Sequence, residues 1–308
     1  MKRFLAAARL LIALSLLLAY GAATAGGRGQ ARPARPFGSE RAYHDLVRQC
    51  EFGPRVPGTK AHHKCAQWLL DQLRGCAQEV SQQRFTQQVG GAEIRLTNLV
   101  AVFNPQGKGH VLLCAHWDSR PMADRDPDPA RRAEPVPGAN DGASGVAVLL
   151  EIARALKRQP PKARVTMVLF DGEDYGTSEA SMLLGSRHFA KSYAGPPVDW
   201  AVLLDMVGDR DLRLPPEQTS WQQARGVVER VWGAAARVGS KAFVREPGPE
   251  VMDDHVPLLE RGIPCIDVID FDYAYWHTTA DTPDKCSAAS LGQVGRALLE
   301  AIGEYKQE

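Results

Sequence analysis

Three acidic residues, Asp171, Glu173 and Asp174, follow an apolar and β-branched run that ends at Phe170. A short run of this kind bounded by glycine predicts a buried strand, here over residues 165–170. In open α/β sheets, ligands bind at the carboxyl ends of the strands. Carboxylates crowded at such a point repel one another unless a cation or a shared proton relieves them. The pattern therefore indicates either a ligand site at the end of this strand or a solvated acidic turn, and the other motifs decide between the two.

Potential metal ligands stand at the ends of other predicted strands as well. His116 and Asp205 each come directly after an apolar run, and His277 lies in the loop that follows the last strand. Asp141 lies among glycines at the start of a predicted helix, where the backbone can approach a ligand closely. Imidazole and carboxylate ligands without thiolate suit Zn²⁺ in a catalytic site that keeps an open coordination position. Because these residues recur at the same end of the predicted strands, we interpret them as one metal site.

Alternating strands and helices must position these side chains, which predicts a layered α/β sheet. We predict strands over residues 84–89, 93–103, 111–115, 165–170, 200–204 and 263–269. We predict helices over residues 185–193, 221–237 and 288–305, with others that begin near Ser39, Thr59 and Gly145. A loop rich in proline and charge runs to Pro137 and is too long for a simple connector, so we expect it to be functional or mobile.

The composition excludes several classes of function. Lysine plus arginine (37) nearly equals aspartate plus glutamate (36), which gives a net charge of +1. This balance provides no electrostatic basis for binding nucleic acid or an anionic membrane. The six cysteines include no Cys-x-x-Cys pair, which argues against a thiolate zinc site. The chain also lacks His-Glu-x-x-His and Gly-x-Ser-x-Gly, the motifs of one metalloprotease class and of many serine hydrolases.

The first 25 residues have the pattern of a secretory signal peptide. They begin with basic residues, continue with an apolar centre and end with a small-residue cleavage site. Residues 26–38, rich in glycine, arginine and proline, predict a flexible lead-in. We therefore expect one domain over residues 39–308, exported to the periplasm or secreted, without stable membrane insertion once the signal is cleaved. Retention of the segment as an uncleaved anchor is the alternative.

Six motifs occur in the order seen in the zinc exopeptidase superfamily, which includes the di-zinc aminopeptidases and the glutaminyl-peptide cyclotransferases. In chain order they are His116-x-Asp118-Ser119, Asn140–Gly145, Asp171–Asp174, Leu204–Met206, Asp253–His255 and Trp276–Thr278. The resemblance covers nearly all of residues 40–308, and it is stronger to the cyclotransferases. The features that resemble that branch are Asp253–Pro257, Leu184–His188 and the tryptophan directly before His277. The resemblance implies a three-layer α/β/α domain with a mixed, mostly parallel central sheet, as in the zinc aminopeptidases.

The resemblance also implies a set of site residues. The ligands of one zinc ion would be Asp141, Asp174 and His277. The catalytic and substrate-binding residues would be Glu173 as the acid/base, Asp205 and Asp253 as its hydrogen-bonded partners, and Trp276 as a wall of the substrate pocket. Asp174 departs from the family pattern, in which glutamate is usual at this position, so the carboxylate is kept but its reach is shorter.

Two reactions are compatible with these residues. A cyclotransferase would convert the N-terminal glutamine of peptides or proteins to pyroglutamate and release ammonia. In the aminopeptidase pattern, His116 and Asp205 instead hold a second zinc bridged by Asp141, and Glu173 activates water. Both extra residues are present, so the number of zinc ions stays open. A non-catalytic binding protein on this fold is a third hypothesis, which is disfavoured because the chain keeps every ligand and the acid/base.

Residues beside the motifs are expected to have structural roles. We expect Asp171 to brace the acidic turn and Asp118 to orient His116. Trp117 is interpreted as a packing residue. His62 is interpreted as a surface or packing residue. The acidic group Asp267, Asp270 and Asp272 is expected to form hydrogen bonds within the loop before His277.

Overall fold

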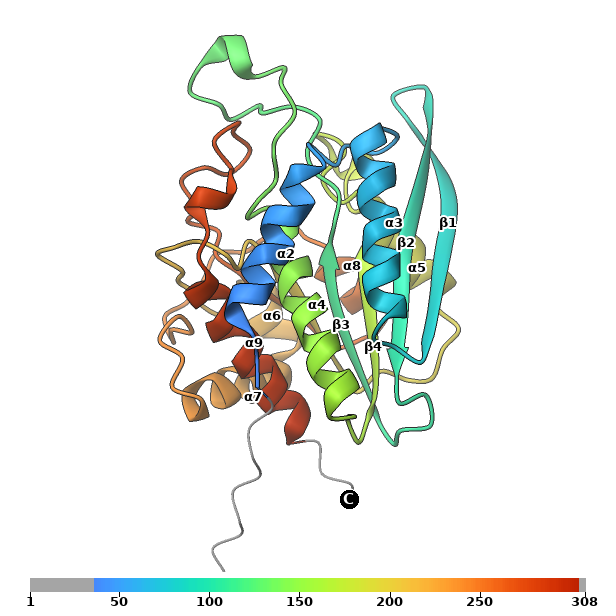
Figure 1. The fold of residues 1–308 in the computed structure, drawn as a ribbon, viewed down its shortest axis with the longest axis vertical. Coiled ribbons are helices and arrows are strands. Elements are labelled where there is room, and N and C mark those ends of the chain that lie inside the picture. The colour runs from blue at the N-terminus through green and yellow to red at the C-terminus, as the bar shows by residue number, and fades with distance from the viewer. Residues whose placement is uncertain (1–35, 305–308) are drawn as a thin grey trace, which may run out of the picture. The chain divides into compact units, whose positions relative to one another are not determined.

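The computed structural model describes residues 36–304 (Figure 1). The carboxyl ends of four parallel strands lie at the same edge of a six-stranded sheet. The strands are β1 (Glu79–Val89), β2 (Ala92–Phe103), β3 (His110–His116), β4 (Arg164–Phe170), β5 (Trp200–Asp205) and β6 (Cys265–Ile269). Their order in the sheet is β1-β2-β4-β3-β5-β6. Strands β4, β3, β5 and β6 are parallel, whereas β1 and β2 pair antiparallel. The prediction of a mixed, mostly parallel sheet is confirmed.

The central strands are buried on both faces because their side chains alternate between two hydrophobic cores. In β3, Leu113 and Ala115 belong to one core, and Leu112 and Cys114 belong to the other. Strands β4 and β5 alternate in the same way. Parallel strands that are covered on both faces have continuous apolar sequences rather than alternating ones. This is the pattern from which the strands were predicted.

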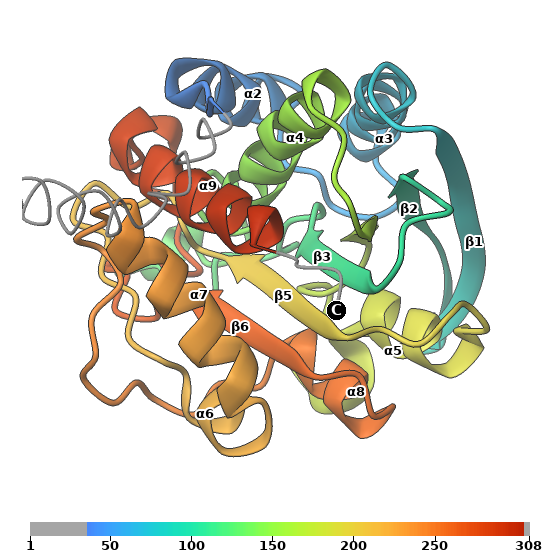
Figure 2. The same ribbon diagram turned by 90° about the horizontal axis from the view of Figure 1, so that it is seen from below.

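Helices cover both faces of the sheet, so the predicted three-layer arrangement is confirmed (Figure 2). The helices on one face are α2 (Ser39–Glu51), α3 (Lys60–Arg74), α4 (Ala143–Arg158), α7 (Arg225–Arg237) and α9 (Ala288–Gly303). Those on the other face include α5 (Leu184–Ser192) and α8 (His255–Glu260), and α6 (Gln218–Gln223) lies beside β6. Short 3-10 helices are η1 (Pro129–Arg131), η2 (Glu179–Ser181) and η3 (Pro283–Lys285). The long loop after β3 carries η1 beyond the edge of the sheet (Figure 1, green).

The segment predicted as one helix over residues 221–237 forms two helices, α6 and α7, so the prediction is wrong in this respect. The helix is interrupted at Ala224, whose backbone is non-helical with φ −133°. The buried Glu217 caps α6 by accepting hydrogen bonds from the backbone N–H groups of Thr219 and Ser220. The carboxylate therefore begins a helix earlier than the hydrophobic spacing indicates.

The predicted signal segment, residues 1–25, and most of the predicted lead-in, residues 26–38, lie outside the described part of the chain. Between residues 36 and 304, none of the helices combines the length and the apolar character that a bilayer crossing requires.

Candidate metal centre and active site

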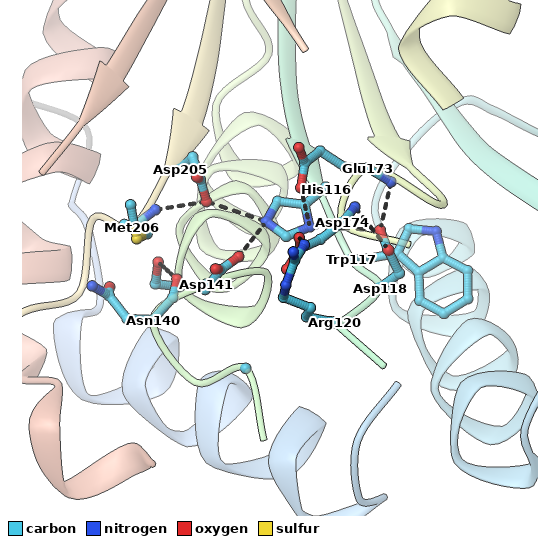
Figure 3. Close-up of polar contacts among 12 residues, drawn as sticks. His116, Trp117, Asp118, Arg120, Asn140, Asp141, Glu173, Asp174, Asp205 and Met206 are labelled. Carbon is cyan, nitrogen blue, oxygen red and sulfur yellow. Dashed lines mark hydrogen bonds and ion pairs between the residues drawn. The ribbon is translucent and has the colours of Figure 1, made fainter. Parts of the chain in front are cut away.

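Five of the predicted site residues lie together at the carboxyl edge of the sheet: His116, Asp141, Glu173, Asp174 and Asp205 (Figure 3). His116 is the last residue of β3 and Asp205 the last of β5, and the turn after β4 carries Glu173 and Asp174. His116 lies opposite Phe170 in the register of β3 and β4, which places this turn beside the imidazole. The three acids of this turn are buried, so the alternative of a solvated surface turn is wrong.

Two groups of three buried side chains could each hold a metal ion. One group is Asp141, Asp174 and His277, and the other is His116, Asp141 and Asp205. Within each group the ligand atoms lie within 4.8 Å of one another. Asp141 belongs to both, because its Oδ1 lies 3.1 Å from Nε2 of His116 and its Oδ2 lies 3.8 Å from Nε2 of His277. The structure thus brings together both predicted ligand sets.

The first group fits a divalent cation. The Oδ2 atom of Asp174 is buried and makes no hydrogen bond to any described residue. Burial, with repulsion from Asp141, raises the pKa of Asp174 well above its usual value, although Arg120 opposes this shift. A cation at this point would relieve the repulsion and take up the unpartnered oxygen. Two carboxylates and one imidazole are donors that bind zinc and leave a coordination position open.

Glu173 directly precedes Asp174, a member of this group, in the turn after β4. Its backbone N–H donates to Asp118 Oδ1 at 3.1 Å, and its Oε2 atom lies 3.8 Å from Nδ1 of His116. The side chain of Glu173 is 10% exposed. Burial raises the pKa of Glu173 well above its usual value, and repulsion from Asp174 and Asp253 adds to this shift while His116 opposes it.

Asp205 and Asp253 were predicted as hydrogen-bonded partners of Glu173, but no hydrogen bond joins either residue to Glu173 in the described part of the chain. Asp205 Oδ1 lies 3.2 Å from Nε2 of His116 and accepts a hydrogen bond from the backbone N–H that follows it. Burial raises the pKa of Asp205 to about 7. Asp253 raises the pKa of Glu173 through charge repulsion. Asp205 and Glu173 both lie close to the ring of His116, which connects them.

Asp118 positions the imidazole and the acidic turn together. Its Oδ1 lies 3.5 Å from Nδ1 of His116, as expected for a carboxylate that orients this ring. Its two oxygens also accept hydrogen bonds from the backbone N–H groups of Glu173 (3.1 Å) and Asp174 (3.3 Å). The second role was not predicted, because no motif shows that the two turns lie side by side.

Asp171 braces the acidic turn, as predicted. Its Oδ1 lies 2.8 Å from Nε2 of His62, and its Oδ2 accepts a hydrogen bond from the backbone N–H of Thr97 at 2.6 Å. His62 stacks on the buried ring of Trp117, with 4.3 Å between the ring centroids. His62 and Trp117 are therefore packing residues, and the pair anchors the turn to α3.

We expect His62→Ala to lower the free energy of unfolding by about 2–4 kcal/mol, because it removes the partner of a buried carboxyl group and opens a cavity beside Trp117. Urea denaturation followed by circular dichroism measures the change. His63→Ala removes the exposed neighbour and should cost less than about 0.5 kcal/mol. Equal losses in the two variants would contradict this role of His62.

Gly142, one of the glycines around Asp141, is required for packing. Its φ is +100°, a left-handed backbone that L side chains rarely adopt. A β-carbon at this position would lie 2.4 Å from the carbonyl oxygen of Asp118 and 3.2 Å from the ring of His116. The protein itself occupies the space beside the glycine.

Asp267 lies within β6, inside the strand predicted over residues 263–269, but the hydrogen bonds expected of its side chain are absent among the described residues. Both of its carboxylate oxygens are buried without a hydrogen-bond partner among the described residues. Burial, together with repulsion from Asp253 and Asp205, raises the pKa of Asp267 well above its usual value. Asp270 accepts a hydrogen bond from the backbone N–H of Arg213 at 2.8 Å, which links two loops.

Three residues that no motif pointed to hold the site together. Arg120 forms ion pairs with Asp174 and Asp124. Asp281 accepts a hydrogen bond from the backbone N–H of Asp141 at 3.2 Å, which fixes the loop that begins α4. The only signal in the sequence was the length of the loop after β3, which contains Arg120 and Asp124.

The buried acids predict a pH dependence of the metal-free protein. The carboxyl groups of Asp205 and Glu173 have raised pKa values in the folded state, mainly through burial, but ionise near pH 4 in an unfolded chain. Their stabilising contribution is present below about pH 4 and is lost as the pH rises through the folded pKa. Burial lowers the pKa of His277 to about 4. This imidazole therefore makes the free energy of unfolding increase with pH, but only below about pH 6.5.

The midpoint temperature of thermal unfolding of the metal-free protein should therefore decrease as the pH rises from about 6.5 to about 8. Added zinc should reduce this decrease, because it would bind the ionised carboxylates of Asp141 and Asp174 and the neutral imidazole of His277, and its charge would favour the ionised forms of Glu173 and Asp205 nearby. Differential scanning calorimetry at several pH values, with zinc and with a chelator, measures both curves. Parallel curves with zinc and with the chelator would contradict the placement of Glu173 and Asp205 beside a metal centre.

Comparison with known proteins gives matches over most of the chain. Residues 98–302 match Peptidase family M28. The glutaminyl-peptide cyclotransferase of Boiga irregularis is 26% identical over 289 residues, which cover 82% of this chain and 77% of that protein. The glutaminyl cyclase of Tannerella forsythia, known from a crystal structure, is 39% identical to this chain and has a TM-score of 0.84. The match covers 88% of this chain and 99% of that chain. A Zn-dependent exopeptidase from Parabacteroides distasonis is 37% identical to this chain and has a TM-score of 0.85. The match covers 88% of this chain and 100% of that chain.

Proposed function

Because the chain belongs to peptidase family M28, a family of zinc-dependent enzymes, we propose that it is a glutaminyl-peptide cyclotransferase. Its substrates would be peptides or proteins with N-terminal glutamine, and its products pyroglutamate and ammonia. The observation that carries this proposal is the placement of Glu173, a mostly buried carboxyl group with a raised pKa, which directly precedes the potential ligand Asp174 and lies 3.8 Å from Nδ1 of His116. Relatives named as glutaminyl-peptide cyclotransferase and glutaminyl cyclase support the choice of reaction.

Asp141, Asp174 and His277 would hold the zinc ion. Bound there, zinc supplies a Lewis acid that stabilises negative charge on the side-chain amide oxygen of the substrate. The chain itself contributes the ligand geometry. Asp141 is held by Asp281, and the backbone of Asp174 is held by Asp118.

Glu173 moves the proton. Its carboxylate takes a proton from the N-terminal amine, whose nitrogen attacks the δ-carbon of the same glutamine. The bond between that carbon and the amide nitrogen breaks, and Glu173 returns the proton to the departing ammonia. The attack is intramolecular, so a site that holds the glutamine folded supplies much of the rate. A raised pKa lets Glu173 both accept and donate a proton near neutral pH.

Asp205 and Asp253 would tune this proton transfer. Asp253 raises the pKa of Glu173 by repulsion, and Asp205 holds His116, whose ring faces Oε2 of Glu173. Although burial alone would lower it, neighbouring carboxylates raise the pKa of His116 well above its usual value. The imidazolium in turn opposes the rise in the pKa of Glu173.

Trp276 would form a wall of the substrate pocket. Its ring lies 3.9 Å from the ring of His277 and 5.1 Å from that of Phe271, measured between centroids. The Arg125 guanidinium lies over its face at 5.3 Å. The indole is half-buried and packs against an apolar cluster that contains Met206. An apolar wall beside the metal ligand would exclude water from the folded glutamine side chain.

A zinc aminopeptidase is the second candidate, and one observation favours it. His116, Asp141 and Asp205 form a second group of buried potential ligands that shares Asp141 with the first. If this group holds a second zinc ion, Glu173 would take its proton from water rather than from an amine. The same scaffold therefore supports hydrolysis of N-terminal residues.

Two assays on the purified protein separate the candidates. Gln-initiated fluorogenic substrates are compared with Leu- and Ala-initiated ones, and bound zinc is measured per chain. The cyclotransferase should turn over the Gln substrates alone and hold one zinc ion. Release of leucine or alanine, with two zinc ions and no pyroglutamate, would establish the aminopeptidase instead.

Export is proposed from the sequence alone. The basic, apolar and small-residue pattern of residues 1–25 supports a cleaved signal, which leaves the proposed lead-in and the domain over residues 39–308. Expression of the full chain with N-terminal sequencing of the exported product tests this. A product that keeps its first residue and stays with the membrane fraction would indicate an anchor.

A further inference from the structure

We propose that Asp124 is a positioning residue for the metal ligand His277, and that Asp124 and Arg120 together link His277 to the second ligand Asp174. All of the groups involved lie outside the proton-transfer chemistry assigned to Glu173. The inference rests on the metal ligands of the proposed function, but it holds equally for a cyclotransferase and for an aminopeptidase.

The two nitrogens of His277 face different partners. Nε2 lies 3.5 Å from Asp174 Oδ1 and 3.8 Å from Asp141 Oδ2, so it faces the other ligands. Nδ1 lies 3.4 Å from Oδ1 of Asp124 and is buried without a hydrogen bond to any described residue. A carboxylate at Nδ1 keeps the proton on that nitrogen and leaves the lone pair of Nε2 free for a metal ion.

Arg120 fixes Asp124 and Asp174 with one rigid guanidinium group. Its Nε lies 2.7 Å from Asp124 Oδ1 and its Nη2 lies 3.1 Å from Oδ2, so both carboxylate oxygens are held. Its Nη1 pairs with Oδ1 of Asp174 and donates to the carbonyl oxygen of Gly176 at 3.0 Å. The side chain of Arg120 is 4% exposed, so water screens these contacts little. Asp124 and Asp174 are thereby held in one arrangement.

The same segment also holds the backbone around His277. This residue has φ +56°, a left-handed conformation that a non-glycine residue keeps only when its surroundings impose it. The N–H of Arg125 donates to the carbonyl oxygen of His277 at 3.1 Å. Asp126 Oδ2 accepts hydrogen bonds from the backbone N–H and the hydroxyl of Thr279, at 2.9 and 2.5 Å. Residues 120–126 therefore position the ring, the backbone and the neighbouring ligand together.

The experiment measures zinc affinity rather than turnover. Metal-free wild type, Asp124→Ala and Asp124→Asn are titrated with zinc in competition with a chromophoric chelator. We expect Asp124→Ala to weaken zinc binding about 10- to 100-fold, as for other carboxylates that orient a metal-bound histidine. Asp124→Asn keeps an oxygen acceptor and should lose less. Glu134→Gln removes an exposed carboxylate from the same loop and should stay within about twofold of the wild type.

A cobalt-substituted form supplies a second readout, because the ligand-field absorption reports the geometry of the metal ligands. The Asp124→Ala spectrum should differ from that of the wild type, whereas the Glu134→Gln spectrum should not. If Asp124→Ala does not fold, judged by thermal unfolding of the metal-free protein, Asp124→Asn takes its place in both measurements.

Two results would overturn the inference, and they are distinguishable. Wild-type zinc affinity and cobalt spectrum in a folded Asp124 variant, with affinity lost in His277→Ala, would overturn the role of Asp124 alone. Unchanged zinc affinity in His277→Ala would overturn the proposed metal ligands and this inference with them.

Discussion

Glu173→Gln should lower kcat for Gln-initiated peptides by about 10²- to 10⁴-fold, the range that a positioned general acid/base contributes. Glutamine keeps the size of the side chain and a polar oxygen, but it cannot take up the proton of the substrate amine. KM should change little, because Glu173 is proposed to act on the proton rather than to hold the peptide. Steady-state kinetics on one Gln-initiated substrate measure both constants.

Two controls make this result specific to proton transfer. The zinc content of Glu173→Gln should equal that of the wild type, since the proposed ligands are Asp141, Asp174 and His277. Glu250→Gln removes an exposed carboxylate near Asp253 and should leave kcat unchanged. A Glu173→Gln enzyme with full turnover would exclude a proton-transfer role in either reaction.

Asp141→Ala should abolish zinc binding and lower kcat/KM by at least about 10³-fold, because the charge that develops on the substrate oxygen loses its stabilisation. Asp141 is the residue that belongs to both groups of potential ligands, so this substitution removes a donor from each. Metal analysis of the dialysed protein and kinetics on a Gln-initiated peptide measure the two effects.

Asp272→Asn provides the matched control, because it neutralises an exposed carboxylate on the loop that leads to His277. Its zinc content and kcat/KM should equal those of the wild type. A folded Asp141→Ala protein that kept its zinc would contradict the assigned metal centre. A protein that lost zinc and kept its turnover would contradict the need for a metal ion.

The strands and the residues at their ends could be predicted from the sequence for one physical reason. Parallel strands buried on both faces need continuous apolar side chains, so a polar residue that ends such a run marks the edge of the sheet. His116 and Asp205 are the clearest cases, and the structure places their side chains 3.2 Å apart. These two side chains lie close together because β3 and β5 are neighbouring parallel strands, which end at the same edge of the sheet.

The residues that were not predicted act through contacts between distant parts of the chain. Asp281 lies 140 positions from the backbone N–H of Asp141 that it binds, and Arg120 lies 54 positions from Asp174. No local periodicity encodes such pairs. The interruption of the helix at Ala224 was not predicted, because the hydrophobic pattern does not show that the side chain of Glu217 caps a separate helix, α6. The lack of a hydrogen-bond partner for Asp267 among the described residues was not predicted, because a buried carboxyl group without a partner is atypical.

The most direct test of the proposed reaction uses one peptide that begins with glutamine followed by leucine, analysed by mass spectrometry and by an assay for ammonia. A cyclotransferase keeps all of the carbon atoms in the peptide, which loses one molecule of ammonia as pyroglutamate forms. We predict this product, with ammonia released in equal amount and no free glutamine. Free glutamine and a shortened peptide that begins with leucine would contradict the proposal and show that water, not the amine of the substrate, is the nucleophile.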